Sequence, residues 1–593
     1  MPSLETLLTV SSAVPADIRG DGAMLVRWNV PGSLQLYLTA PGTDVLRQLT
    51  ELDEPVDGRF VPGSGRLLLS VDAGGNERAQ LYLADPEPGA PHEPLVVEPD
   101  FLHLTPRLSP DGTLLAYACN RRNGQDLDVF VRTLATGEEH CVFAPGGYCE
   151  VTGFSPDGNL LGVLRLTERT GDNDLHLVDL SSGETVHVAP EEDDARFGAP
   201  AWAHDSRSFA FSTDSGRDVA GIARYDLASQ RWAYVLEDEW DLEVDADVEG
   251  RSFVVHANVD GASRLTLHDP TTLAELRELE LPDVGVVDAI RLSEDGRWLA
   301  YGFSSPRRAW EAFRLDLEGG GAAEAVTETP IRVPPDELQA PSLRRFASFD
   351  GESIPYLLFE PATEPPWPVV VEVHGGPESQ RRPMWMPVIQ YLVAHGYAVA
   401  QPNVRGSTGY GKRYEHLDDG RLRLDSVRDM TTLRDELLLD PRIDGDRVVL
   451  YGGSYGGYMV LAGLAFEPAR WAAGIAVVAI SHLVTFLRNT SAYRRALRER
   501  EYGSLEHDLD FLTEASPLTH VDRMEAPLLL IHGANDPRVP LSEAEQLHRA
   551  LRDRGIPCEL LVYPDEGHGL QKLHNKLDAY PKAVAFLDAA LRR

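Results

Sequence analysis

The chain has 593 residues, 43% of them hydrophobic, so it is long enough for two or more domains with separate cores. Its formal net charge of −38 disfavours nucleic acids and anionic membranes as partners, because both would repel it. Four cysteines without paired zinc or redox spacing predict no disulfide framework and fit a reducing, cytoplasmic setting. The N-terminus lacks the basic residues of a signal peptide, and no apolar run approaches membrane-spanning length.

A turn followed by a short apolar run recurs through the first half of the sequence. The repeats are 43, 47, 46, 48, 44 and 46 residues apart, counted at Gly22, Gly65, Gly112, Gly158, Ser206, Gly250 and Gly296. This period is typical of a four-stranded propeller blade, and Asp-Gly turns suit its hairpins. Seven repeats therefore predict a seven-bladed β-propeller without WD or kelch signatures. The competing interpretation is an irregular all-β region in which such turns recur by chance.

The first half of the chain is also the acidic half. Residues 1–340 contain 26 Lys and Arg against 59 Asp and Glu, a charge of −33, whereas residues 341–593 contain 29 against 34, a charge of −5. A solvated acidic surface is the simplest interpretation; the alternative is that carboxylates line the central channel and attract cationic ligands. The proline-rich stretch 328–342 suits a connection between domains. We place the propeller at residues 1–335 and a second domain at 336–593, with the first few residues packed on the second domain.

The second half alternates buried-strand runs with helix-like segments. The strand runs are 367–375, 397–404, 446–453, 526–533 and 558–564. Helix-like segments such as 430–439 and 542–555 lie between them. Unbroken apolar strands between helices predict a doubly wound, mostly parallel sheet covered on both faces.

A serine follows one of these strands inside a G-x-S-x-G pattern. The sequence "GGSYG" at 452–456 places Ser454 between a buried strand and a segment that can form a helix. Glycines allow the tight elbow that lifts a serine hydroxyl above the sheet. The pentapeptide alone is weak evidence, because a chain with 51 glycines produces such patterns by accident.

Two downstream loops supply the partners that a nucleophilic serine needs, a base and a carboxylate that orients it. Asp536 and His568 each follow a buried strand, and the order Ser454, Asp536, His568 is that of α/β-hydrolases. His532 is interpreted as a packed residue at a strand end. Asp565 and Glu566 adjoin His568 and are expected to shape its turn.

Acyl transfer also needs hydrogen-bond donors for the oxyanion of the tetrahedral intermediate. We expect the backbone N–H of Tyr455 to be one donor and that of Gly376, in the loop "VHGGPESQ", to be the other. His374 in the same loop is assigned a structural role, since no second histidine or carboxylate nearby has metal-site spacing.

In combination, these motifs resemble the prolyl oligopeptidase family of serine peptidases. The likeness rests on residues 346–361, "HGGP" at 374–377, "PNVRGSTGYG" at 402–411, "GGSYGG" at 452–457, "HGANDPRVP" at 532–540 and "DEGHG" at 565–569. The resemblance implies a propeller that restricts access to an α/β-hydrolase domain, and oligopeptide substrates. The implied acyl-enzyme mechanism needs no metal or organic cofactor. The sequence leaves open whether the chain forms a homo-oligomer.

The "HGGP" form is similar to the acylaminoacyl-peptidase branch of that family. In that branch an arginine between the nucleophile and the acid helps to bind the substrate, which implies Arg494, with Arg488 and Arg495 as neighbouring alternatives. A helix this rich in arginine also suits a solvated face. Aminopeptidase, acylaminoacyl-peptidase and general oligopeptidase activities stay open. A carboxylesterase or thioesterase on the same three residues is the alternative, because the fold does not fix the acyl group.

Overall fold

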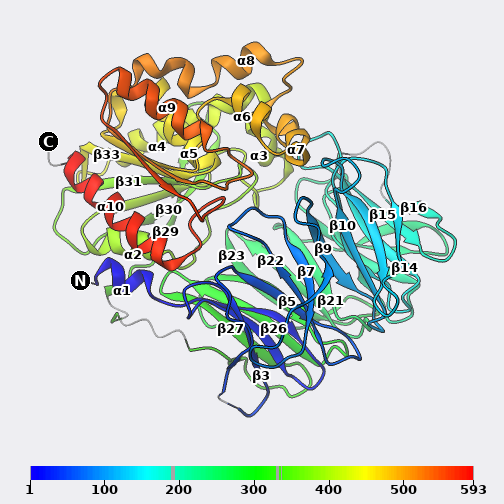
Figure 1. Ribbon diagram of the computed structural model, residues 1–593. Coiled ribbons are helices and arrows are strands. Elements are labelled where there is room, and N and C mark those ends of the chain that lie inside the picture. The colour runs from blue at the N-terminus through cyan, green and yellow to red at the C-terminus, as the bar shows by residue number, and fades with distance from the viewer. Residues whose placement is uncertain (1, 44, 189–193, 329–332, 335–336, 592–593) are drawn as a thin grey trace.

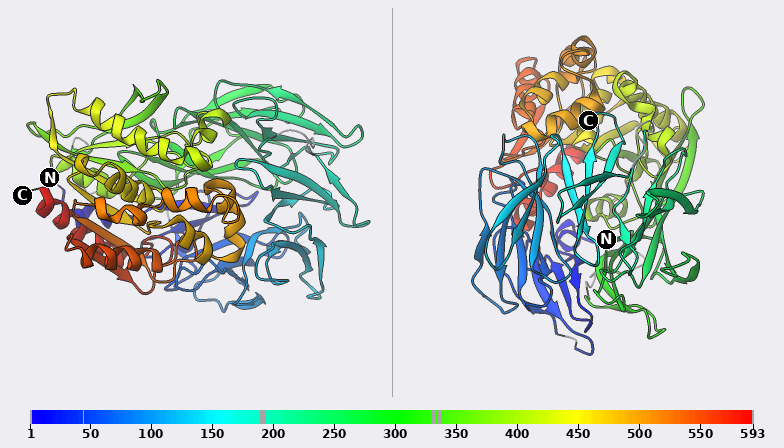
Figure 2. Two further views of the ribbon diagram at one scale, coloured as in Figure 1. Left: turned by 90° about the horizontal axis from the view of Figure 1, so that it is seen from above. Right: turned by 90° about the vertical axis from the view of Figure 1, so that its right-hand side faces the viewer.

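The computed structural model describes residues 2–43, 45–188, 194–328, 333–334 and 337–591, which form two lobes in contact (Figure 1). The lobe built from the first half consists of small sheets arranged in a ring, and the other lobe is a sheet between helices (Figure 2). The predicted boundary between residues 335 and 336 lies outside the described residues. No helix among the described residues combines the length and the apolar character needed to cross a membrane.

The first lobe confirms the seven-bladed propeller. Each blade is a four-stranded antiparallel sheet whose strands follow one another in the chain. The blades are β1(Ala13–Ile18), β2(Met24–Trp28), β3(Gln35–Thr39), β4(Arg47–Gln48); β5(Val56–Phe60), β6(Leu67–Val71), β7(Gln80–Ala84), β8(Glu93–Val96); β9(His103–Leu108), β10(Leu114–Cys119), β11(Asp128–Thr133), β12(Glu139–Phe143); β13(Cys149–Phe154), β14(Leu160–Leu166), β15(Asn173–Asp179), β16(Thr185–His187); β17(Ala201–Trp202), β18(Ser208–Thr213), β19(Gly221–Asp226), β20(Arg231–Leu236); β21(Leu242–Ala246), β22(Phe253–Val259), β23(Ala262–His268), β24(Glu275–Leu279); and β25(Val286–Leu292), β26(Trp298–Ser305), β27(Arg308–Asp316), β28(Glu324–Ala325).

Side chains, rather than a shared strand, join the first blade to the last. Blade 1 takes all four strands from the N-terminal end and blade 7 takes all four from the other end of the propeller. Met24 and Val26 of blade 1 pack against Ala300 and Ala312 of blade 7. The buried Arg314 donates to the carbonyl oxygen of Gly22 at 2.9 Å. Apolar burial and this hydrogen bond therefore close the ring.

The second lobe contains one eight-stranded sheet in the order β29-β30-β32-β31-β33-β34-β35-β36. The first three strands in this order pair antiparallel and the rest pair in parallel. The strands are β29(Ser342–Ala347), β30(Ser353–Phe359), β31(Trp367–Val373), β32(Ala398–Pro402), β33(Ile443–Gly453), β34(Ala473–Val477), β35(Leu528–Gly533) and β36(Cys558–Tyr563). The helices are α1(Leu4–Leu8), α2(Pro387–Ala394), α3(Lys412–Glu415), α4(Arg423–Leu437), α5(Tyr455–Phe466), α6(Leu483–Asn489), α7(Ala492–Tyr502), α8(Leu509–Glu514), α9(Ser542–Asp553) and α10(Leu573–Leu591).

Helices cover both faces of this sheet because its strands are apolar on both faces. Val369 and Val371 point to the core formed with α4, α5 and α9, whereas Val370 points to the core formed with α2 and α10. Leu4 and Leu8 of the N-terminal helix α1 belong to this second core. The first residues of the chain thus pack on the second lobe, against α2 and α10 (Figure 1).

We expect Met24→Ala to weaken the closure of the ring. Met24 is fully buried between blades 1 and 7, and removing such a side chain leaves a cavity that costs about 2–5 kcal/mol. Urea unfolding followed by tryptophan fluorescence measures this loss. Leu276→Ala is the matched control, because Leu276 is 59% exposed. Equal stability losses in the two variants would show that the blade 1–blade 7 contact does not support the ring.

Candidate active site

Ser454 lies at a strained turn between the end of β33 and the start of α5. Its φ of 59° and ψ of −119° fall in a region that residues with a Cβ rarely adopt, at a cost of about 1–3 kcal/mol. Gly452 and Gly456 do not adopt a left-handed conformation; they are needed because other backbone atoms come too close to leave room for a Cβ. A Cβ on Gly456 would lie 2.1 Å from the carbonyl oxygen of Val373, and one on Gly452 would lie 2.4 Å from that of Gly456. The elbow is therefore packed directly against the end of β31.

The structure brings Ser454, His568 and Asp536 into one hydrogen-bonded chain. The Ser454 hydroxyl lies 3.0 Å from Nε2 of His568, and Nδ1 of His568 lies 2.8 Å from Oδ2 of Asp536. The other carboxylate oxygen of Asp536 accepts from the backbone N–H groups of Arg538 and Val539 at 2.8 and 3.0 Å. Asp536 is thus fixed by its own loop, and the arrangement allows a proton to pass from the hydroxyl to the imidazole.

The neighbouring polar residues of these two loops have structural contacts. Nε2 of His532 donates to the carbonyl oxygen of Val539 at 2.9 Å and so holds the loop of Asp536. The buried Glu566 accepts from the backbone N–H groups of Gln571 and Lys572. Asp565 accepts from the Asn575 side chain at 3.0 Å. These contacts agree with the structural roles expected for His532, Asp565 and Glu566.

The glycine-rich loop after β31 lies over Ser454. A Cβ on Gly375 would lie 3.3 Å from the Ser454 Cβ, and Gly376 lines the cavity beside the Ser454 hydroxyl. Nδ1 of the buried His374 contacts the carbonyl oxygen of Gly375 at 2.7 Å, and Nε2 lies 2.9 Å from the Ser407 hydroxyl. A carbonyl can only accept, so Nδ1 carries the proton, and the Ser407 hydroxyl beside Nε2 donates to the carbonyl oxygen of Val404 at 2.6 Å. His374 therefore holds the loop in place.

A cavity of about 190 Å³ opens beside Ser454 and His568. Both apolar and charged side chains line it: Ile480, Phe486, Tyr502, Val539, Arg494, Arg498, Arg538 and Glu378. Burial and the nearby Arg538 and Arg498 lower the pKa of Arg494. Arg494 thus lies in this cavity, as the resemblance implied. Arg488 is exposed, and the Arg495 guanidinium donates to the carbonyl oxygens of Leu487 and Arg488.

Sequence reasoning did not identify Arg498 and Arg538 in this cavity. Arg498 lies four residues after Arg494, one helical turn along α7, so helical spacing could have predicted it. Arg538 is two residues from Asp536, which was a weaker signal. Its contact with the propeller had no signal in the sequence.

A propeller loop contacts both loops that carry Asp536 and His568. This blade 2 loop, residues 72–79 between β6 and β7, accepts a hydrogen bond from the Asn535 side chain at the carbonyl oxygen of Gly74, at 2.9 Å. Glu77 in the loop pairs with Arg538, with 2.5 Å between Oε1 and Nε. A Cβ on Gly567, next to His568, would lie 2.0 Å from the carbonyl oxygen of Gly75. The propeller is thus in direct contact with the loops that hold the polar chain of the site.

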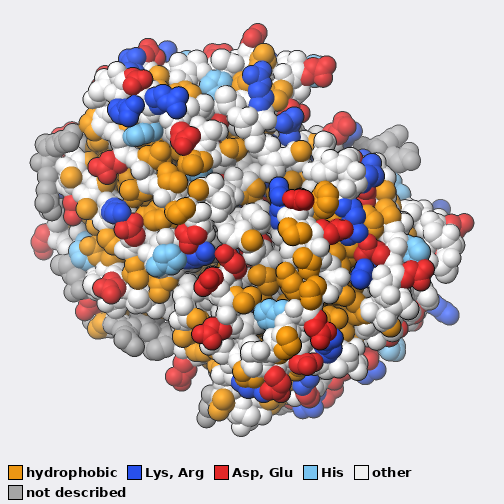
Figure 3. All heavy atoms as spheres, viewed as in Figure 1, with side chains coloured by type: hydrophobic (Ala, Val, Ile, Leu, Met, Phe, Trp, Pro, Cys, Tyr) orange, Lys and Arg blue, Asp and Glu red, His pale blue; other side chains and the backbone are white. Residues whose placement is uncertain are grey.

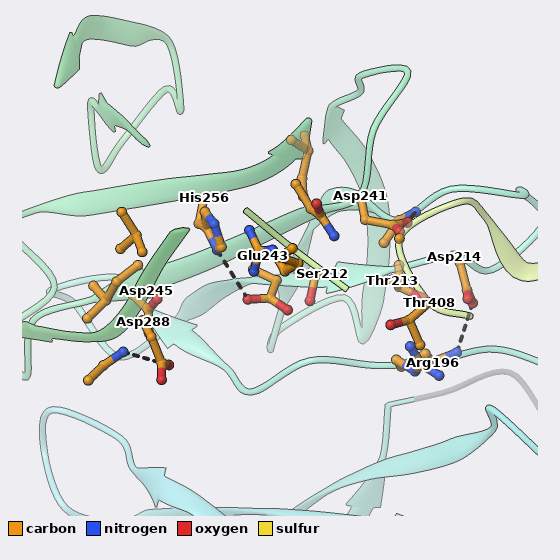
Figure 4. A pocket seen from close by; sticks show the side chains of 18 of the residues that line it. Arg196, Ser212, Thr213, Asp214, Asp241, Glu243, Asp245, His256, Asp288 and Thr408 are labelled. Atoms are coloured by element: carbon orange, nitrogen blue, oxygen red, sulfur yellow. Dashed lines mark hydrogen bonds and ion pairs between the residues drawn. The ribbon is translucent and has the colours of Figure 1, made fainter. Parts of the chain in front are cut away.

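A second, larger cavity lies where the propeller meets the second lobe (Figure 4). Its volume is about 600 Å³. Carboxylates and cations both line it: Asp214, Asp241, Glu243, Asp245, Asp288, Glu415, Arg27, Arg196, Arg291, Arg382 and Lys412. Burial raises the pKa of Asp245 to about 6. The alternative that carboxylates line a cavity of the propeller is thus confirmed only in part, because cations accompany the carboxylates there. Acidic side chains are also dispersed over the outer surface (Figure 3).

A buried ionic network lies behind the elbow. Arg423 contacts the carboxylates of both Asp418 and Glu501, and all three side chains are shielded from solvent. The Tyr455 hydroxyl, one residue after Ser454, donates to Asp418 at 3.0 Å. Burial raises the pKa of Glu501 to about 7. Since Glu501 belongs to α7, the network ties the helix that carries Arg494 to the start of α5.

Comparison with known proteins gives two family matches. The family model described as "Prolyl oligopeptidase family" matches residues 384–593, and "Prolyl oligopeptidase, N-terminal beta-propeller domain" matches residues 60–323. The dipeptidyl aminopeptidase BIII of Pseudoxanthomonas mexicana is 29% identical over 538 residues, which are 86% of this chain and 76% of that protein. The acylamino-acid-releasing enzyme of Rattus norvegicus is 29% identical over 267 residues, 44% of this chain and 36% of that protein. A puromycin hydrolase crystal structure superposes with a TM-score of 0.86 at 21% identity, covering 99% of this chain and 96% of that one.

We expect His374→Gln to flatten the loss of stability on acidification. Burial lowers the pKa of His374 from 6.5 to about 4, so between these values the unfolded chain binds a proton that the folded chain does not. Its contribution is present in full above about pH 6.5 and is lost as the pH falls towards 4, by about 3 kcal/mol in total. Urea unfolding at several pH values measures the slope. His140→Gln is the control, because His140 is exposed on blade 3. An unchanged slope in His374→Gln would contradict this assignment.

Proposed function

Because the chain belongs to the prolyl oligopeptidase family of serine peptidases, we propose that it hydrolyses short peptides through an acyl-enzyme on Ser454. One observation carries the proposal: the Ser454–His568–Asp536 chain, with contacts of 3.0 and 2.8 Å, lies at a cavity that both Ser454 and His568 line. Hydroxyl, imidazole and carboxylate in this order are the groups that activate a serine for acyl transfer.

In this proposal Ser454 attacks the scissile carbonyl carbon while His568 takes the hydroxyl proton. Asp536 keeps the imidazole oriented and stabilises its protonated form. The backbone N–H groups of Tyr455 and Gly376 receive the oxyanion. The C–N bond then breaks, and His568 gives its proton to the departing amine. Water deprotonated by His568 attacks the acyl-enzyme, which releases the acid and restores Ser454.

The interface between the lobes supports a preference for short peptides. The blade 2 loop contacts the loops of Asp536 and His568, and the 190 Å³ cavity is bounded by residues of several elements. A folded protein does not fit such a space, whereas an extended chain end does. Carboxylesterase or thioesterase activity is the second candidate, since Ser454, His568 and Asp536 do not by themselves select the acyl group.

For the N-terminus of the substrate, N-acylated peptides are our first candidate. The Arg494 and Arg498 side chains line the cavity, and neither forms an ion pair with a carboxylate among the described residues; the Arg498 guanidinium donates to the carbonyl oxygen of Gly376 at 3.5 Å. Guanidinium groups donate and cannot accept, so they suit the carbonyl oxygen of an acyl group and would repel a free ammonium group. This favours the acylaminoacyl-peptidase activity.

A free N-terminus is the second candidate. Glu77 lines a neighbouring cavity of about 320 Å³ together with Asp72 and His568, and its carboxylate could pair with an ammonium group. A relative that aligns over 86% of this chain is named a dipeptidyl aminopeptidase, whereas the acylamino-acid-releasing enzyme aligns with less than half of it.

We expect Ser454→Ala to abolish labelling by a fluorophosphonate probe and to lower kcat about a millionfold. Asp536→Asn should lower kcat about ten-thousandfold, because the imidazole loses its orienting carboxylate. Hydrolysis of acetyl-Ala, free Ala, Gly-Pro and succinyl-Gly-Pro amides, beside short-chain p-nitrophenyl esters, measures the activities. Asp565→Asn is the control carboxylate on the His568 loop and should stay active. Full labelling of Ser454→Ala would remove Ser454 as nucleophile, and turnover of esters alone would favour the esterase.

We expect Arg494→Ala to raise KM for acetyl-Ala amides more than it lowers kcat, with kcat/KM reduced about 10- to 100-fold for one charged hydrogen bond. Arg488→Ala is the matched control, because Arg488 is an exposed arginine outside the cavity. If free-amine peptides are the substrates instead, Glu77→Gln should weaken their turnover more than that of the acetylated ones, beyond any common loss from the broken Glu77–Arg538 pair. Unchanged kinetics in Arg494→Ala would exclude Arg494 from substrate binding.

A further inference from the structure

Two histidines and an aspartate share one face of the outer edge of blade 4. His176 of β15 and His187 of β16 are direct partners in the antiparallel register. Asp174 precedes His176 by two residues, so it points to the same face of the strand. Directly opposed side chains have Cβ atoms about 4.5–5.5 Å apart, which is within reach of a common ligand. One ligand atom from each of the three residues lies within 4.8 Å of the others.

The contacts inside this cluster leave the His176 ring without a partner. Nε2 of His187 lies 3.2 Å from one Asp174 oxygen, and Nε2 of His176 lies 4.0 Å from the other. The two imidazole rings stack with centroids 4.7 Å apart. Both ring nitrogens of His176 are shielded from solvent and make no hydrogen bond. Buried polar atoms are nearly always satisfied, so His176 indicates a missing ligand.

Two other clusters of potential ligands among the described residues already hold an arginine. In the group Glu98, His103 and Cys119, Arg121 contacts Glu98 at 3.1 Å and the Cys119 sulfur at 3.4 Å. In the group Asp418, Asp419 and Glu501, the guanidinium of Arg423 lies between carboxylates.

In the blade 4 cluster the neighbouring arginine, Arg165, contacts Asp174 but neither histidine. Arg165 approaches one oxygen of Asp174 at 3.5 Å, while its Nε donates to the carbonyl oxygen of Gly146. The other Asp174 oxygen faces His187. Asp174 and His187 also line a cavity of about 930 Å³ between the propeller and α7, which gives an ion a path to the cluster.

We propose that Asp174, His176 and His187 bind a divalent transition-metal ion of the Zn²⁺ type. Imidazole nitrogen and carboxylate oxygen are ligands that such ions prefer, and water completes a four-coordinate shell. The ion would satisfy a His176 nitrogen and fasten the edge strand β16 to β15. The site is separate from Ser454, so it does not depend on the proposed peptidase activity.

Titration of EDTA-treated, dialysed full-length protein with Zn²⁺ by isothermal calorimetry tests this site. We expect one ion per chain. His187→Gln and Asp174→Asn should each weaken binding at least about 100-fold, since even groups that only support metal ligands are worth 10- to 100-fold. His187 is one-third exposed and Asp174 is one-quarter exposed, so both variants should fold. Zn²⁺ should also raise the Tm of the wild type but not of these variants.

His140→Gln is the matched control, because His140 is an exposed histidine beside a carboxylate, Glu138, on the neighbouring blade. It should bind Zn²⁺ as the wild type does. Folding of every variant is checked by circular dichroism and by its Tm in EDTA. Wild-type affinity in folded His187→Gln and Asp174→Asn, or no binding by the wild type, would overturn the proposal.

Discussion

The site depends on a backbone contact at the centre of the hydrolase sheet. The helix that follows Ser454 begins so close to β31 that a single Cβ at Gly456 would collide with the Val373 carbonyl oxygen. Because the chain must turn within one residue, Ser454 takes the strained conformation, with φ of 59°. Its hydroxyl is thereby raised at the carboxyl edge of the parallel strands, where the loops after β35 and β36 deliver Asp536 and His568. The core on both faces of the sheet holds this strain.

The propeller takes part in this arrangement. The Glu77–Arg538 ion pair connects the blade 2 loop to the segment that fixes Asp536, and Gly567 packs on Gly75 beside His568. A relative movement of the two lobes would therefore disturb the loops that carry Asp536 and His568. Behind the elbow, Arg423 joins the start of α5 to α7 through Asp418 and Glu501. The helix that carries Arg494 and the helix that follows Ser454 are thus joined by the same buried charges.

The sequence was informative wherever a local pattern determines the structure. The interval between turns is fixed by the size of a blade, so Gly112 and Gly158 report the propeller without any tertiary information. The grouping of Ser454, Asp536 and His568 could be predicted because strand ends in a parallel sheet share one edge. Pairing between residues remote in the sequence could not be predicted: Glu77 and Arg538 are 461 positions apart. The Asp174 cluster depends on strand register, which a single sequence specifies poorly. The glycines of the elbow were predicted, but their physical reason, close approach, required the structure.

Charge around the small cavity limits what the substrate can offer. Arg538 is neutralised by Glu77, whereas Arg494 faces Arg498 and Arg538, and this repulsion, together with burial, lowers its pKa. Such guanidinium groups favour a ligand that supplies acceptor atoms, because hydrogen bonds donated by a cation are stronger than those between neutral groups. The carbonyl oxygens of an acylated chain end are such atoms. The Glu77 carboxylate of the blade 2 loop pairs with Arg538 and also accepts from the Tyr493 hydroxyl of α7 at 3.4 Å, so the contact between the lobes joins the two segments that carry the arginines of this cavity.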